Sequence, residues 1–280
     1  MSLDPLLKRL NLLHLREQPV ELHQALLEVA GVVSPTILIK DAFKFIIHGK
    51  LLELEIYLAC GGDVDGIADY AIMREMSQRI DIGDTLLIVA VSLNMEDAIE
   101  LLLNHGANIN IGNDIGATPL SIAVLRENYT LARRLVEKGA NFNTRDKYGN
   151  APIHYSKSLT FSAYLISIGV DIDMKGFGGR SPLHFAVLHA DLDRIRQLIS
   201  LGASCNAKAK YGETPLHLVC SGYEYPPEKL MKIGDYLINN GWSDINAQDM
   251  FGCTPLHWAV GAGITDEENL KYMFSCPSVD

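Results

Sequence analysis

Apolar side chains recur along most of this chain with the spacing of a helix rather than that of a strand. In residues 98–103 (AIELLL) and 131–136 (LARRLV), apolar residues return every three or four positions. Both segments are followed by a glycine, Gly106 or Gly139, a residue that readily adopts the left-handed conformation found at helix ends. The same arrangement precedes Gly169, Gly202 and Gly241. The pattern predicts a series of short amphipathic helices, each of which ends at a glycine.

A second pattern is a phrase that begins with glycine and, in its fullest form, reads Gly-x-Thr-Pro-Leu-His. It occupies residues 83–88, 116–121, 149–154, 179–184, 212–217 and 252–257, so its glycines lie 33, 33, 30, 33 and 40 positions apart. The glycine supplies a positive φ, the Thr or Ser caps a helix, and the proline takes the first helical position, where its missing N–H is harmless. Each unit is predicted to contain a helix, a short connection, a second helix and an extended turn.

The phrase and its period near 33 residues resemble the ankyrin repeat. The resemblance covers about two thirds of the chain, from Gly83 to the end. It implies an all-α solenoid with short β-like turns. Residues 39–82 are expected to form a degenerate repeat with an insertion around residues 70–79. Six repeats follow, at residues 83–115, 116–148, 149–178, 179–211, 212–251 and 252–280, the last of them incomplete.

The two ends of the chain carry separate expectations. Residues 1–38 contain two amphipathic helical patterns, which we interpret as an N-terminal helical cap for the solenoid. A targeting or partner-binding role is the alternative for this segment. At the other end, residues 278–280 correspond to the point where the preceding repeat enters its turn. Because an unfinished repeat would expose an apolar face, we expect a fragment of a longer protein, in which any catalytic domain lies beyond residue 280.

The composition is typical of a folded protein in a reducing compartment. Of the 280 residues, 48% are hydrophobic and 21% are charged, and the net charge of −10 argues against indiscriminate nucleic-acid binding. The five cysteines are an odd number at irregular spacing, and no apolar stretch approaches the ~20 residues that cross a bilayer. We expect a cytoplasmic location, with the nucleus or, after secretion, a host cytosol as alternatives. The oligomeric state is not fixed, although a monomer is favoured.

No pattern indicates catalysis, a cofactor or a bound metal, so we predict that the chain is not an enzyme. The strongest candidates for metal ligands are the histidines that end the phrase, namely His154, His184, His217 and His257. The resemblance implies instead that they form structural hydrogen bonds between neighbouring turns. The glycine-rich residues 176–179 lack the strand, helix and Lys-Ser/Thr pair of a phosphate loop, and we interpret them as a shortened repeat turn.

Positions that vary within the repeat carry the functional prediction. Counted from the phrase glycine, they are Arg145, Lys175 and Lys208 four before it, Lys147, Phe177, Lys210 and Met250 two before it, Tyr148, Tyr211 and Phe251 directly before it, and Arg180 after it. Equivalent positions lie side by side in a solenoid. These residues are therefore predicted to form a surface of cations and aromatic side chains at the turn tips, which we call the basic stripe.

In ankyrin repeats, the turn tips and the exposed end of the first helix form a concave partner-binding surface. The corresponding helix positions in this chain are Leu93, Leu125, Arg126, Leu159, Leu188 and His189. An apolar floor rimmed by Arg, Lys, Tyr and Phe has the composition of a protein interface. The predicted partner-binding residues are therefore Arg126, Leu188 and the basic stripe. The alternative is that the charged side chains only solvate polar turns.

The asparagines that end each repeat raise a separate prediction. Asn246, with Asp244 two residues and Ile238 eight residues before it, best matches the asparagines that a hydroxylase modifies in this family. A turn-stabilising hydrogen bond is the alternative, because Asn side chains commonly bond to backbone groups in turns.

Together these features predict a non-catalytic scaffold that binds an acidic or phosphorylated segment of a protein partner on its concave face. The irregular repeats of 30 and 40 residues and the helical cap resemble ankyrin proteins that intracellular bacteria inject into host cells. A competing prediction is the substrate-recruiting part of a larger enzyme or of a ubiquitin-ligase-type complex. The catalytic region of that enzyme would lie beyond residue 280.

Overall fold

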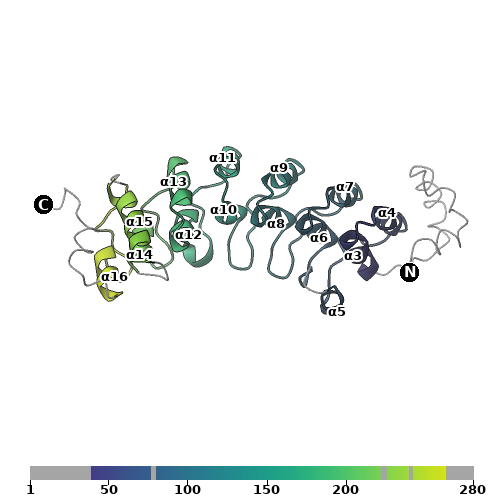
Figure 1. Cartoon of the computed structure of the whole chain (residues 1–280), viewed down its shortest axis with the longest axis horizontal. Helices are drawn as coiled ribbons and strands as arrows, with labels where there is room; N and C mark the ends of the chain where they lie inside the picture. Colours follow the sequence, from purple (N-terminus) through teal and green to yellow (C-terminus); the bar gives the residue numbers. More distant parts are fainter. Residues whose placement is uncertain (1–38, 77–79, 222–225, 240–241, 263–280) are drawn as a thin grey trace, which may run out of the picture. The chain divides into compact units, whose positions relative to one another are not determined.

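The computed structural model describes residues 39–76, 80–221, 226–239 and 242–262 (Figure 1). The chain divides into two compact units, Met1–Asn141 and Phe142–Asp280, which we call unit 1 and unit 2 and describe separately. The predicted N-terminal cap and the second helix of the incomplete last repeat lie outside the described residues.

The described part of unit 1 contains three helix pairs. They are α3 (Ile39–Ile47) with α4 (Leu51–Ala59), α6 (Leu86–Ser92) with α7 (Glu96–Asn104), and α8 (Pro119–Leu125) with α9 (Tyr129–Glu137). The first helices pack in one row, α3 against α6 and α6 against α8, while α4 packs against α7 in a second row (Figure 1). Both rows contribute fully buried side chains, such as Phe43 and Leu87 from one and Leu54 and Ile99 from the other. Each pair is therefore stabilised by its neighbours.

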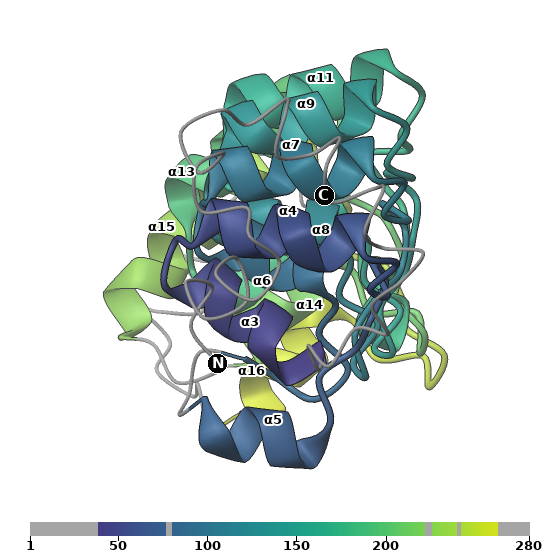
Figure 2. The same ribbon diagram turned by 90° about the vertical axis from the view of Figure 1, so that its right-hand side faces the viewer.

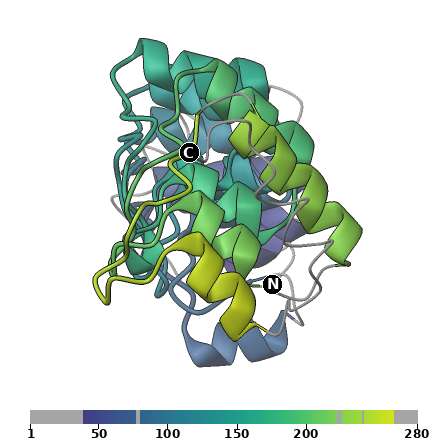
Figure 3. The ribbon, with the colours of Figure 1, turned by 90° about the vertical axis from the view of Figure 1, so that its left-hand side faces the viewer.

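Unit 2 continues the same pattern of helix pairs. Its helices are α10 (Pro152–Tyr155), α11 (Leu159–Ser167), α12 (Pro182–Leu188), α13 (Leu192–Ser200), α14 (Pro215–Cys220), α15 (Pro227–Asn239) and α16 (Pro255–Gly261), with a 3-10 turn, η2, at Phe177–Gly179. Helix α14 contacts α12, α15 and α16, and Figure 3 shows α16, in yellow, beside the green α14. One hydrophobic cluster joins these helices, from Leu183 on α12 to Ala259 on α16.

The repeated phrase starts helices as predicted. Proline is the first residue of α8, α10, α12, α14 and α16, and the phrase glycine has a positive φ, for example 76° at Gly116. The Thr118 hydroxyl oxygen accepts a hydrogen bond from the Ser121 N–H at 3.3 Å and so caps α8. At Gly179 the close approach of the next turn also requires glycine, because a Cβ there would lie only 2.7 Å from the backbone nitrogen of Lys210.

In unit 2, the histidine that ends the phrase links one repeat to the next. His184 Nδ1 accepts a hydrogen bond from the Ser181 N–H at 3.2 Å, which leaves Nε2–H to donate to the Glu213 carbonyl of the next turn at 3.1 Å. Equivalent bonds run from His154 to Met174 O at 2.9 Å and from His217 to Cys253 O at 3.0 Å. The implied structural role of these histidines is confirmed, and we call the three bonds the histidine ladder.

The repeat of 30 residues is short in its first helix. Helix α10 has four residues, whereas α8 and α12 have seven each. The second helix accordingly begins 10 positions after Gly149 but 13 positions after Gly116 or Gly179. The turn that ends at Gly179 begins 10 positions earlier, at Gly169, and this distance equals that from Gly139 to Gly149. The interpretation of residues 176–179 as a shortened turn is therefore wrong.

The described residues are all-helical, as predicted. Their strand-like pairing is limited to an isolated bridge between Ile67 and Thr85. Adjacent turns are nevertheless β-like, since the Lys210 N–H donates to Gly178 O at 2.9 Å and the Met250 N–H to Tyr211 O at 2.8 Å. Across the part of the chain that the structure describes, no helix is long and apolar enough to cross a membrane.

The insertion that precedes Gly83 contains a short helix, α5 (Tyr70–Glu75). Asp69 caps it, because its Oδ1 accepts a hydrogen bond from the Ile72 N–H at 2.8 Å. Helix α5 lies on the side of α3 opposite to α4 (Figures 1 and 2). An ion pair of 2.6 Å between Lys44 and Glu75 ties α5 to α3.

Protonation of the histidine ladder should destabilise unit 2 at acid pH. Burial lowers the pKa of His184 to about 4, and the nearby charge of Arg180 acts in the same direction. Because an unfolded histidine has a pKa of about 6.5, His184 contributes its full stabilisation above that pH, and roughly 3 kcal/mol is lost as the pH falls from about 6.5 to about 4. Urea unfolding at a series of pH values, followed by circular dichroism, measures this loss.

The variant His184→Asn provides the control. It should be less stable than the wild type at neutral pH, because ladder hydrogen bonds are lost, but its stability should depend less steeply on pH. His189→Asn replaces an exposed histidine at the end of the same helix and should behave like the wild type. An unchanged pH dependence in His184→Asn would contradict the assignment.

Candidate protein-binding surface

Two turn tips of unit 2, those at Gly149 and Gly252, are held by carboxylates that accept backbone hydrogen bonds within the turn. Asp146 Oδ1 accepts from the Tyr148 N–H, and Asp249 Oδ1 accepts from the Phe251 N–H, both at 2.9 Å. Trp258 Nε1 donates to Asp249 Oδ2 at 3.0 Å. Burial alone would raise the pKa of Asp249, but the Trp258 and backbone hydrogen bonds outweigh it and lower that pKa. These bonds give each tip a defined conformation.

Three cations of the basic stripe link consecutive turns. Arg145 donates to the carbonyl oxygen of Lys175, Lys175 to that of Lys208, and Lys208 to that of Gln248, the last at 3.1 Å. Each donor therefore bonds to the residue at its own position in the next repeat, and we call these bonds the cation ladder. The recurrence of cations at this position thus has a structural cause. All three side chains remain exposed, and each keeps further N–H groups for a partner.

A second set of cations lies beside aromatic rings at the tips. Lys147 Nζ is 5.6 Å from the ring centroid of Tyr148, and Lys210 Nζ is 5.4 Å from that of Tyr211. Tyr148 and Phe177, from adjacent repeats, meet edge to face with centroids 6.2 Å apart. All three rings are about half exposed. The tips therefore present cations next to accessible aromatic surface.

The other predicted residues differ in their accessibility. Met250 and Phe251 are exposed at the tip of the last described turn. Arg180 is half-buried, and its Nε has no hydrogen-bond partner among the described residues. Leu188 is half-buried against the hydrophobic cluster of unit 2, so only part of it is available to a partner.

The cations of the basic stripe are not held in ion pairs with described residues. In the described parts of the chain, none of the six forms a salt bridge with a carboxylate. Arg134 in unit 1 offers a contrast, because it pairs with Glu96 at 3.2 Å and with Glu100 at 2.6 Å. The basic stripe therefore concentrates positive charge on a chain whose net charge is −10.

Some predicted positions do not join the basic stripe. Arg126 and Leu125 are exposed at the end of α8 and belong to unit 1, whereas the whole basic stripe belongs to unit 2. Leu159 is the first residue of α11, because α10 ends at Tyr155, and so it does not lie at the end of a first helix as predicted. In unit 2 the predicted apolar floor is reduced to Leu188.

The asparagine positions also form bonds between repeats. Asn110 Oδ1 accepts from the Asn141 N–H at 2.7 Å, and Asn206 Oδ1 accepts from the Asp244 N–H at 2.8 Å. Asn110 and Asn206 therefore form structural hydrogen bonds that join neighbouring repeats, which differ from the turn-stabilising bond given above as the alternative. Asn246 is exposed, and its hydroxylation stays a prediction.

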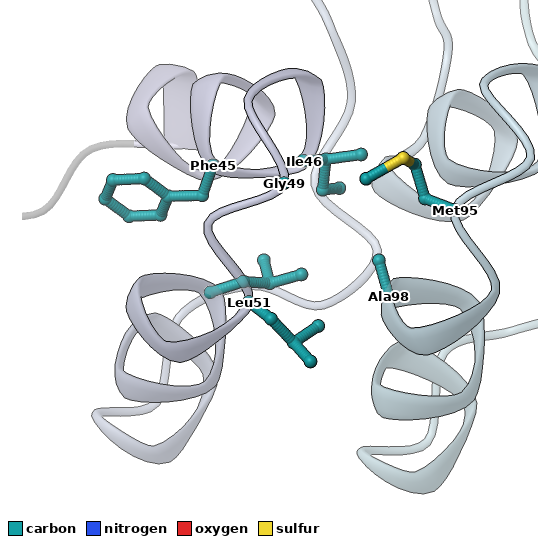
Figure 4. Close-up of a pocket in the computed structure, with 7 residues that line it drawn as sticks. Phe45, Ile46, Gly49, Leu51, Met95 and Ala98 are labelled. Atoms are coloured by element: carbon teal, nitrogen blue, oxygen red, sulfur yellow. The ribbon is translucent and has the colours of Figure 1, made fainter. Parts of the chain in front are cut away.

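The described residues hold no cluster of side chains suited to binding a metal ion, and two of their cysteines have raised pKa values. No group of three His, Cys, Asp or Glu side chains among them could hold a metal ion. Burial raises the pKa of Cys205 to about 11 and that of Cys220 to about 12, which keeps both thiols protonated near neutral pH. In unit 1, Ile46 and Met95 face each other across an apolar cavity of about 30 Å³ (Figure 4), enough for about one water molecule.

Comparison with protein families agrees with this geometry. A model described as ankyrin repeats (3 copies) matches residues 56–146, 87–176, 121–209 and 183–279, which together cover most of the chain. The chain belongs to the ankyrin repeat family. Ankyrin repeats are generally protein–protein interaction modules and are typically non-catalytic.

Curated relatives that this chain matches are much longer than it is. The chicken nuclear factor NF-kappa-B p105 subunit is 29% identical over 197 residues, which are 68% of this chain and 16% of that protein. Human transient receptor potential cation channel subfamily A member 1 is 35% identical over 106 residues, 36% of this chain and 9% of the channel. This chain therefore spans less than a fifth of either protein.

A solved structure supports the fold. The ankyrin repeat domain of Bcl-3, described as a unique member of the IkappaB protein family, superposes with a TM-score of 0.63. The two chains are 21% identical, and the match covers 83% of this chain and 96% of that one. At this identity the likeness shows the shared fold alone.

Sequence reasoning does not single out the carboxylates that shape the tips. Asp146 and Asp249 both stand three positions before the phrase glycine, and Asn113 fills the same position in unit 1. Asn113 Oδ1 likewise accepts from the N–H of Ala117 at 3.0 Å. Their shared position and their side-chain oxygens are the signal that could have identified them.

The cation ladder predicts that two pairs of lysines differ in their contribution to stability. Lys175→Met with Lys208→Met should lower the free energy of unfolding by roughly 1–2 kcal/mol, because two hydrogen bonds between turns are lost. Lys147→Met with Lys210→Met should lower it less, because a Lys-Tyr pair adjacent in sequence also meets in the unfolded chain. Urea unfolding measures both values, and equal losses would contradict the ladder.

Proposed function

We propose that this chain is a non-catalytic interaction scaffold whose basic stripe binds an acidic or phosphorylated segment of a protein partner. The observation that carries the proposal is the set of six cations without a carboxylate partner among the described residues, placed beside half-exposed aromatic rings. Phosphate and carboxylate groups are the anions that Lys and Arg side chains recognise in proteins.

The geometry of the tips supports this proposal energetically. The cation ladder and the tip carboxylates hold the binding groups in place before a partner arrives, which reduces the conformational entropy lost on binding. The charges of Lys147 and Lys210 would steer an acidic segment, while Tyr148, Phe177 and Tyr211 provide apolar contact area.

Finer predictions rest on the sequence alone. A role as a bacterial effector in a host cell, and a cytoplasmic, nuclear or host-cytosolic location, stay predictions. The same holds for the alternative of a substrate-recruiting part of a larger enzyme or ubiquitin-ligase-type complex. That alternative is consistent with the small share of the longer relatives that this chain spans, 16% and 9%.

The sharpest test of the proposal reverses charge at Lys147 and Lys210, which stand outside the cation ladder. Lys147→Glu with Lys210→Glu should reduce binding to an acidic or phosphorylated partner peptide at least about tenfold, with little change in melting temperature. Affinity purification with mass spectrometry supplies the peptides, and fluorescence anisotropy measures their affinity.

The matched control is Lys50→Glu with Lys232→Glu, which changes the net charge equally at exposed positions away from the basic stripe. This control should bind such a peptide about as tightly as the wild type. An equal loss in both double variants, or full binding by Lys147→Glu with Lys210→Glu, would contradict the proposal. Copurification of ligase subunits or catalytic proteins would favour the substrate-recruiting alternative.

A further inference from the structure

The turn tips of unit 1 carry the opposite chemistry to those of unit 2 at the same repeat positions. The two residues before the phrase glycine are Asp81 and Ile82 in one turn and Asp114 and Ile115 in the next. In the turns at Gly149 and Gly212 of unit 2 they are a lysine and a tyrosine. Acid replaces base, and an aliphatic side chain replaces an aromatic one.

Backbone contacts bring the two turns of unit 1 together. The Asp114 N–H donates to Ile82 O at 3.4 Å, and Asn113 Nδ2 donates to Asp84 Oδ1 at 2.8 Å. Ile82 and Ile115 are 38% and 39% exposed. Two exposed isoleucines thus lie on neighbouring turns beside exposed aspartates.

The insertion before Gly83 extends this surface. The Ala68 N–H donates to Asp84 O, and the Gly83 N–H donates to Ala68 O, both at 2.8 Å, so the segment that leads into α5 runs alongside the first turn. On that segment Ile67 is 56% exposed, and Tyr70, the first residue of α5, is 63% exposed. Figure 2 shows α5 apart from the other helices of unit 1.

Some carboxylates at this surface form hydrogen bonds or ion pairs within the chain, and others form no salt bridge with any described residue. Asp69 caps α5, Glu75 pairs with Lys44, and Asp84 accepts hydrogen bonds from Asn113 Nδ2 and from a backbone N–H. Asp81 and Asp114 are exposed, and the described residues include no salt-bridge partner for either one. Two carboxylates are therefore available beside four exposed apolar side chains.

We infer that Ile67, Tyr70, Asp81, Ile82, Asp114 and Ile115 form a second docking surface, which binds a protein segment that alternates lysine or arginine with aliphatic residues. We call this surface the acidic tip patch. The isoleucines and Tyr70 would cover the aliphatic side chains of the segment, and Asp81 and Asp114 would pair with its cations. Because these ion pairs would be partly shielded from water, they would add selectivity for a basic segment over an acidic one.

This inference does not depend on the function proposed for the basic stripe. Because the two surfaces carry opposite charge at equivalent positions, a segment suited to one is repelled by the other. Each unit would therefore select a different kind of segment.

The experiment uses the full chain and two labelled synthetic peptides as probes, one alternating isoleucine with lysine and the other serine with lysine. Fluorescence anisotropy should show binding of the isoleucine–lysine peptide that is at least about tenfold tighter than that of the serine–lysine peptide. Asp81→Asn with Asp114→Asn should weaken it about fivefold to tenfold. Ile82→Ser with Ile115→Ser should weaken it by a similar factor.

The control Asp97→Asn with Asp193→Asn removes the same charge from exposed positions on α7 and α13 and should change the affinity less than about twofold. Lys147→Glu with Lys210→Glu should also leave it within that range, which separates this inference from the proposed function. Equal weakening by both aspartate pairs, equal binding of both peptides, or no binding of either would overturn the inference. Thermal unfolding of each variant excludes misfolding as the cause.

Discussion

The structure of unit 2 depends on hydrogen bonds that run from a side chain of one turn to a backbone carbonyl of the next. The imidazoles of His154, which is half-buried, and of His184 and His217, which are buried, form the inner set. These hydrogen bonds require neutral rings. Burial favours neutral rings because it lowers the pKa values of all three histidines. In unit 2 this inner set adds to the backbone hydrogen bonds between turns in fixing their register, on which a surface built from equivalent turn positions depends.

The outer set, the cation ladder, shows that a residue can serve stability and recognition together. Arg145, Lys175 and Lys208 each use an N–H to hold the next turn and still expose charge. Their recurrence in sequence is therefore no proof of binding by itself. Lys147 and Lys210 form no such bond between turns, so substitutions there test partner binding with less effect on stability. In unit 1, Asp81 and Asp114 occupy the repeat position of Lys147 and Lys210. The tips of the two units therefore differ in charge at this position.

Much of the fold could be predicted because its signals are local and repeated. Glycine, proline and the capping hydroxyl act within a few residues, as at Gly116, Thr118 and Pro119, and so they can be recognised in the sequence alone. Contacts between turns cannot be recognised in this way, because they depend on the spacing of adjacent repeats. The cation ladder cannot be predicted for that reason. The spacing of 30 residues from Gly149 to Gly179 does indicate a shortened repeat, but only the structure places the shortening in α10 rather than in the turn. The site was predicted only as a set of positions, since the division of roles between Lys175 and Lys147 appears only when the turns are placed side by side.

Nuclear magnetic resonance of the histidine side-chain nitrogens tests the central claim most directly. In the intact chain, His154, His184 and His217 should show the Nε2–H tautomer, with slowly exchanging Nε2 protons. His184 should remain neutral at about pH 5.5, and His154 and His217 should titrate below the ordinary value of about 6.5. Titration of these three imidazoles near pH 6.5, or rapid exchange of their ring protons with water, would contradict the account, because the turns would then lack the bonds that hold them in register.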